Sequence, residues 1–186
     1  AQPDDIAAEF FGISVHEAGL ITPPYPMEAS SDQDGYWGFD STRASIPVLE
    51  VMERTKISYL QLQLLLQCAW ITPEGDPQVH LTRPATSADL NRQTLDALTP
   101  KVLDRVHRLL RLAKHTPWDI WELDLLLRAD RIGAGTLDRD ALVALHGAGL
   151  LAERLGVGAE QLATWFGELP VVGRPSPTDP TSLSSA

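Results

Sequence analysis

The sequence predicts an all-α fold, built as an irregular stack of helix–turn–helix units with long loops and a Pro/Ser-rich C-terminal tail. Three observations predict it. Apolar residues recur at steps of three and four, no stretch alternates apolar and polar residues long enough to indicate a strand, and Leu and Ala far outnumber β-branched residues. The periodic stretches are Val48–Met52, Leu60–Leu66, Leu103–Ala113, Leu123–Leu127, Leu142–Leu155 and Leu162–Phe166.

The composition is that of a globular protein. The chain has 186 residues, 44% of them hydrophobic and 22% charged, and its formal net charge is -10. Its single cysteine, Cys68, excludes an internal disulfide and a cysteine-based zinc site. No apolar run approaches the roughly 18 to 20 residues that cross a bilayer. The start Ala1–Asp5 also lacks the basic and apolar segments of a signal peptide, so we expect a soluble chain.

A helix-start pattern recurs four times. In each copy an apolar residue precedes a capping position, and Glu or Gln follows three residues later. The capping side chain would accept from the backbone N–H three residues on, and the Glu or Gln would reach back to the cap. Each pattern follows an apolar or amphipathic stretch, which predicts four helix–turn–helix units. The pairs are Ser14 and Glu17, Ser58 and Gln61, Asp119 and Glu122, and Gly158 and Gln161, although Gly158 has no side chain to cap with.

The segments between units predict loops. Pro23–Pro26 with Glu28–Gly35, and Thr72–Pro84, are too rich in Pro, Gly and polar residues to be helical throughout. We therefore expect one helical domain over residues 1–172. Residues 173–186, with three prolines among Ser and Thr, are expected to form a linker or tail.

Two polar patterns suggest nucleic-acid or anion binding. Leu151–Trp165 superficially resembles a DNA-binding helix-turn-helix, but Ala159–Glu168 contains no basic residue to contact phosphate. A basic row on the Lys101–His115 helix could meet an anionic partner. The alternative, a solvated face or ion pairs with neighbouring acidic side chains, is favoured because acids are in excess. The row comprises Lys101, Arg105, Arg108, Arg111 and His115.

The remaining chemistry-bearing residues predict no active site. Asp32–Gly35 resembles a calcium loop, but its frame ends at Ser41 where a Glu is required. His16-Glu17 lacks the second His of a zinc helix, and Cys68 sits in an apolar run typical of a buried thiol. We therefore expect no enzyme, no catalytic, cofactor-binding or metal-binding residues, and no cofactor. His80, His107, His115 and His146 lack ligand spacing, and Trp37, Trp70, Trp118, Trp121 and Trp165 are most simply packing residues.

Several of these segments resemble one known family. Tyr36–Phe39, Val51–Leu62, Leu98-Thr99 and Leu103–Leu112, with Trp118, Glu122–Asp124 and Leu150–Trp165, are similar to the helical shell region of the A component of bacterial Tc toxins. The resemblance covers most of residues 6–169, and its most specific part is Leu103–Arg108 with the Trp and Glu-Leu-Asp that follow. It implies a scaffold region of a large secreted or cell-surface toxin subunit that assembles as a pentamer around a translocation channel.

The functional prediction follows from the repeats and the resemblance together. We expect a non-catalytic scaffold whose partners are protein segments of a toxin complex, including other copies of itself, with no nucleic acid and no direct membrane insertion. An alternative is a stand-alone adaptor or structural subunit of another secretion or injection machine. A third reading, a ligand-binding domain or enzyme using the tryptophans, requires a pocket with convergent polar groups.

Overall fold

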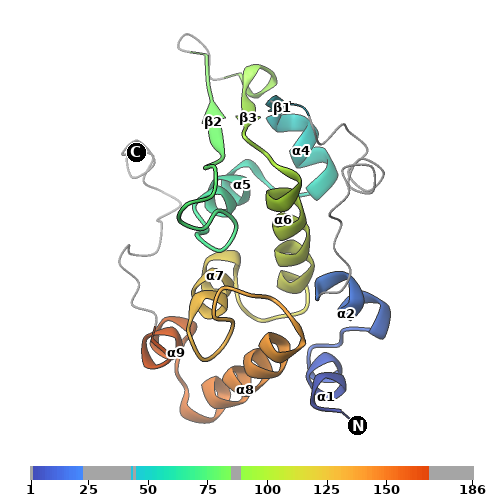
Figure 1. Cartoon of the computed structure of the whole chain (residues 1–186), viewed down its shortest axis with the longest axis vertical. Helices are drawn as coiled ribbons and strands as arrows, with labels where there is room; N and C mark the ends of the chain where they lie inside the picture. The colour runs from blue at the N-terminus through green and yellow to red at the C-terminus, as the bar shows by residue number, and fades with distance from the viewer. Residues whose placement is uncertain (1, 23–42, 44, 85–88, 168–186) are drawn as a thin grey trace.

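The computed structural model describes residues 2–22, 43, 45–84 and 89–167. The loop predicted at 23–35 and the tail predicted at 173–186 lie outside these residues. The described part contains eight α-helices and a small antiparallel sheet at one end of the molecule (Figure 1). In chain order the elements are α1 (Pro3–Phe10), α2 (Val15–Ile21), β1 (Ser45–Pro47), α4 (Val48–Thr55), α5 (Tyr59–Leu66), β2 (His80–Thr82), the 3-10 helix η1 (Leu90–Arg92), β3 (Thr94–Asp96), α6 (Pro100–Ala113), α7 (Ile120–Arg128), α8 (Arg139–Leu155) and α9 (Ala159–Trp165).

The four predicted helix–turn–helix units are present as α1–α2, α4–α5, α6–α7 and α8–α9. Ser58 and Asp119 form the expected reciprocal caps with Gln61 and Glu122. Ser14 accepts from the Glu17 N–H at 3.2 Å, but the Glu17 carboxylate turns away to Arg111 instead of closing the cap. In the fourth unit the Gly158 N–H donates to Gln161 Oε1 at 3.3 Å, so half of the reciprocal cap persists without a capping side chain.

Three of the turns share one backbone conformation. Gly12, Lys56 and Gly156 each lie in the left-handed region, with φ of 65°, 59° and 65°. Each of these residues is followed by an apolar residue and then by the cap of the next helix. A left-handed residue at this point satisfies the last carbonyls of the first helix, as in the Lys56 N–H that donates to Met52 at 2.8 Å. The chain direction therefore changes within three residues, by local hydrogen bonds alone.

The all-α prediction is wrong, because the described residues also form a three-stranded antiparallel sheet with the order β1-β3-β2. Ile46, Leu95 and Leu81 stand opposite one another across the three strands. Ile46 and Leu95 are buried, while Leu81 is half-buried at the edge. The fold is therefore mixed α/β. Each strand has only three residues, too few for an alternating pattern to stand out, and β2 lies in the segment that composition predicted as loop.

The units do not stack in chain order, so the fold also differs from the predicted solenoid-like stack. In the first unit α1 packs on α8 and α2 packs on α6, which joins the beginning of the chain to the third and fourth units. The sheet and α4 lie at one end of the elongated molecule, and α1, α8 and α9 lie at the other (Figure 1). Between them, α6 and α7 contribute fully buried leucines to one continuous core.

The connection from α7 to α8 folds back over the end of α7. Gly135 N–H donates to the Leu127 carbonyl at 2.9 Å, and Ala134 N–H donates to Ala129 at 3.0 Å. Gly133 lies against this helix end so closely that a Cβ there would come within 2.6 Å of the Leu127 Cα and carbonyl carbon. Since backbone atoms cannot move aside as a flexible side chain can, this position requires glycine.

Replacing Lys56 by glycine should stabilise the protein. A side chain in the left-handed region is strained, and removing it should raise the free energy of unfolding by about 1 kcal/mol. Lys114 provides a matched control, because it also ends a helix but has the right-handed φ of -73°. Lys114→Gly should lower the free energy of unfolding by roughly 0.5–1 kcal/mol. Urea denaturation of both variants tests this; a destabilised Lys56→Gly variant would contradict the assigned conformation.

Gly133→Ala should destabilise the fold by about 2–3 kcal/mol, because the added methyl group overlaps the Leu127 backbone. Gly147 lies inside α8 with nothing near its would-be Cβ. Gly147→Ala should therefore stabilise by roughly 0.5–1 kcal/mol through helix propensity. The midpoints of thermal and urea unfolding should fall for Gly133→Ala and rise for Gly147→Ala. A Gly133→Ala variant as stable as the unaltered protein would contradict the close approach of Gly133 to the Leu127 backbone.

Candidate functional site

The basic row of α6 is used inside the protein. Arg105 Nη1 lies 3.1 Å from Asp76 Oδ2, and Lys101 Nζ lies 2.9 Å from the same oxygen. Hydrogen bonding from Lys101 and the charge of Arg105 lower the pKa of Asp76. Asp76 belongs to the segment between α5 and β2. The sequence left a choice between an anionic partner and internal ion pairs, and the structure confirms ion pairing for this part of the row.

Arg108 connects three segments at the centre of the row. Its Nε donates to the Ile21 carbonyl at the end of α2 at 2.6 Å, and its Nη2 donates to the Leu137 carbonyl before α8. Its Nη1 lies 3.4 Å from Asp104 one turn earlier in α6. The guanidinium also lies over the Trp70 ring, 5.9 Å from its centroid. Arg108 therefore joins the end of α2 and the segment before α8 to α6.

Arg111 binds Glu17 of α2 through a forked contact. Its Nη1 lies 2.8 Å from Oε1 and 2.7 Å from Oε2, and its Nε donates to His107 Nε2. His115 Nε2 lies 3.8 Å from the same carboxylate. Burial acts to raise the pKa of Glu17, but the hydrogen bond and charge of Arg111 together with the charge of His115 lower it overall. Glu17 is thus an ionised anchor for α2.

His107 is buried and is held neutral. Burial, with the neighbouring charge of Arg111, lowers its pKa from 6.5 to about 4. Its Nε2 accepts from Arg111, a role that only the neutral imidazole can fill. His107 is therefore a structural part of the α2–α6 contact at neutral pH.

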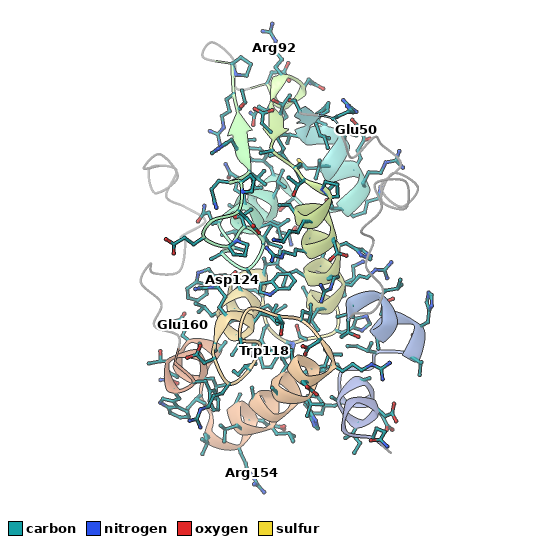
Figure 2. The ribbon with its side chains drawn as sticks, viewed as in Figure 1. Glu50, Arg92, Trp118, Asp124, Arg154 and Glu160 are labelled. Carbon is teal, nitrogen blue, oxygen red and sulfur yellow. The ribbon has the colours of Figure 1, made fainter. Side chains whose placement is uncertain are left out.

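A buried carboxylate, that of Asp124, joins α7 to the segment after α5. Asp124 Oδ1 accepts from the Trp70 N–H at 2.7 Å, and Oδ2 lies 3.0 Å from Arg128 Nε. Figure 2 shows Asp124 and Trp118 in the interior, while Arg92 and Arg154 project at opposite ends. Cys68 is buried beside this pair, and burial followed by the Asp124 charge raises its pKa well above the ordinary value. A thiol in this state is a poor nucleophile at neutral pH.

The other candidate residues do not converge on one site. Among the residues that the structure describes, no three His, Cys, Asp or Glu side chains could hold a metal ion together. Asp32–Gly35 and Trp37 lie outside the described residues. Trp70 and Trp118 are buried in the core, whereas Trp165 is more than half exposed on α9. His16 and His80 are exposed and His146 is half-buried against Phe10, with 4.5 Å between ring centroids.

One cleft combines apolar walls with charged side chains. It lies between the α4–α5 turn and the α6–α7 connection and has a volume of about 450 Å³. We call it the basic cleft, after three of its lining residues, Arg54, Lys56 and Lys114. Its one acidic lining residue, Asp119, accepts from the Glu122 N–H at 2.9 Å in the α7 cap. The apolar lining residues are Ile57, Leu64, Leu110, Ala113, Trp118, Ile120 and Trp121.

The basic cleft was missed by the sequence analysis. Its walls come from two segments some fifty residues apart in the chain, and each wall taken alone contains an ordinary mixture of apolar and basic residues. Trp118 and Trp121 were the available signals, since both belong to the tryptophans considered for ligand binding. The cleft has the dimensions of a binding surface, but it contains no arrangement of nucleophile, acid and base.

No known family model matches this chain, and neither a curated protein nor a solved structure matches it. The likeness to Tc toxin A components therefore depends on the sequence segments quoted above.

The described helices include none that is by itself long and apolar enough to cross a membrane. Taken together, α8 and α9 are long and apolar enough to cross a membrane, but the chain bends by 115° between the two helices. Leu142 and Leu145 of α8 and Leu162 of α9 are buried in the core, which accounts for much of the apolar character of the pair.

His107 should make folding stability depend on pH. The unfolded chain binds a proton near pH 6.5 and the folded chain only near pH 4, so stability should fall as pH decreases through this window. The loss should approach roughly 3 kcal/mol by pH 4. His107→Gln keeps an acceptor for Arg111 but cannot titrate, so it should remove most of this loss. Urea denaturation at pH 7 and pH 4.5 tests the difference, with exposed His16→Gln as the control that should behave as the unaltered protein does.

Proposed function

We propose that this chain is a non-catalytic helical scaffold segment of a subunit like the A component of Tc toxins, with a role in the protein–protein assembly of a toxin translocation complex. The observation that carries the proposal is the recurrence of helix–turn–helix units at all four expected turns. Three of these turns lie in segments that carry the resemblance, around Ser58, Asp119 and Gly158. Repeated units of this kind build surfaces by packing on their neighbours.

The use of charge supports a scaffold role. Glu17, Asp76 and Asp124 each bind basic side chains, and Arg108 is directed at backbone carbonyls. Apart from the Asp124–Arg128 pair, which lies within α7, these contacts join separate segments of the fold. Catalytic groups, in contrast, are aimed at a space in which a substrate can react. The polar groups of the α6 region therefore favour a mechanical role over a chemical one.

Exposed apolar side chains at one end of the molecule support assembly with other protein. Ile6 and Phe10 of α1, Leu150 and Leu155 of α8, and Trp165 of α9 are all large and exposed. These helices lie together at the same end (Figure 1). Exposed apolar surface of this kind commonly marks a contact with other protein.

The mass of the natural polypeptide tests this function. Native mass spectrometry of the complex isolated from its source, followed by denaturation, gives the stoichiometry and the covalent mass of the chain that carries this sequence. We expect a polypeptide of a few hundred kilodaltons in an oligomer. A free chain near 20.4 kDa bound to one different partner would contradict it and would favour the adaptor role in another secretion machine.

A further inference from the structure

The basic cleft requires an occupant with both apolar surface and negative charge. Ile57, Leu64, Leu110, Ala113 and Trp121 are all only half-buried along its walls. Arg54, Lys56 and Lys114 add three positive charges, against the single carboxylate of Asp119. The cleft is locally cationic in a chain whose formal net charge is -10. Complementary charge of this kind selects the partner and accelerates association.

Helix α1 of the same chain has the complementary face. Ile6 and Phe10 lie one turn apart and are 46% and 45% exposed. Asp5 and Glu9 form a parallel row one turn apart and are also exposed. The helix contains no Lys, Arg or His. It therefore presents Ile6 and the outer part of Phe10, whose ring also packs on His146, beside two carboxylates, the combination that the cleft requires.

The other exposed apolar side chains lack this combination. Val15 stands near Glu17, whose carboxylate is already bound by Arg111. Leu60 lies on α5, which contains no acidic residue. Leu150 and Leu155 lie on α8, where the exposed Glu153 is followed directly by Arg154. Trp165 lies on a seven-residue helix whose acidic residue is Glu160 alone. Among the described residues, α1 is thus the element best matched to the cleft.

The α1 helix cannot reach the cleft of its own molecule. It packs on α8 and α2 at one end of the fold, whereas α4, α5, α6 and α7 form the cleft further along the long axis (Figure 1). We propose that α1 of one copy binds in the basic cleft of a second copy, with Ile6 and Phe10 against the apolar walls and Asp5 and Glu9 among the three cations. Such a contact joins two different surfaces, so it adds copies head to tail.

The contact rests on the proposed scaffold function and gives it one specific assembly surface. A two-turn helix in a cleft buries less than the roughly 1,200–2,000 Å² of stable complexes, so the association of isolated chains should be weak. Because Arg54, Lys56 and Lys114 are exposed to solvent, added salt should weaken the association further. These two properties define the conditions under which the contact can be measured.

Sedimentation velocity of the full chain provides the first measurement. Between about 10 and 500 µM protein at roughly 50 mM salt, the sedimentation coefficient should rise with concentration, and raising the salt about tenfold should weaken association at least fivefold. Sedimentation that does not change over this range would overturn the proposal.

Charge reversal provides the specific test. Lys56→Glu with Lys114→Glu should weaken self-association at least about tenfold, and Asp5→Lys with Glu9→Lys should do the same. A mixture of these two double variants should associate, because each α1 then meets a cleft of opposite charge. Both variants remain net negative, so general attraction would not explain such a result. Arg131→Glu with Arg154→Glu is the matched control outside the cleft, and it should self-associate as the unaltered chain does.

A second α1 variant guards against loss of the helix. Asp5 accepts from the Gln2 N–H at 3.2 Å, so its replacement also weakens the start of α1. Ile6→Ser leaves this hydrogen bond intact and should still weaken association about fivefold, with unchanged circular dichroism. Association that survives Ile6→Ser, or a mixture of the charge variants that stays monomeric, would overturn the proposal. Neither result affects the mass of the natural polypeptide, on which the scaffold function itself is judged.

Discussion

The Arg108 guanidinium joins the end of α2, the segment before α8 and Asp104 of its own helix, and it covers the ring of Trp70. Removing a guanidinium from water is costly, and the cost is offset only when its N–H groups all find acceptors in good geometry. The two carbonyl acceptors belong to segments far apart in the chain. Correct placement of α2 and α8 therefore supports Arg108, and Arg108 in turn holds both segments against α6.

The rest of α6 extends the same principle along one column. Towards its beginning, Lys101 and Arg105 hold the segment after α5 through Asp76, and towards its end Arg111 holds α2 through Glu17. On the opposite side, leucines such as Leu103 and Leu109 are fully buried. One helix thus organises the protein through an apolar face and a basic face at once, and each basic side chain has a partner outside its own turn of helix. The basic row is thus used in contacts within the fold.

The features predictable from sequence were those set by neighbouring residues. Ser58, Asp119 and Gln161 reveal their helix starts because both ends of each hydrogen bond lie within four positions. The strand Ser45–Pro47 pairs with Thr94–Asp96, and nothing within three residues of either segment shows this pairing. The basic cleft is hidden for the same reason, since Lys56 and Trp121 meet only through tertiary packing. The partner of Arg111 was likewise unpredictable, because Glu17 already had a plausible role in the cap of its own helix.

The difference between local turns and strands that pair over long distances in the chain also affects the order of folding. The α4–α5 turn joins residues only a few positions apart, so it can form as fast as a short loop closes. Pairing β1 with β3 must first bring together segments about fifty residues apart, which carries a larger entropic barrier. We therefore expect the α4–α5 turn to be protected before the sheet in pulsed hydrogen-exchange refolding. The contacts of α1 with α8 and of α2 with α6 close still longer loops, so the first unit of an emerging chain gains its packing partners only after α6 and α8 have been made.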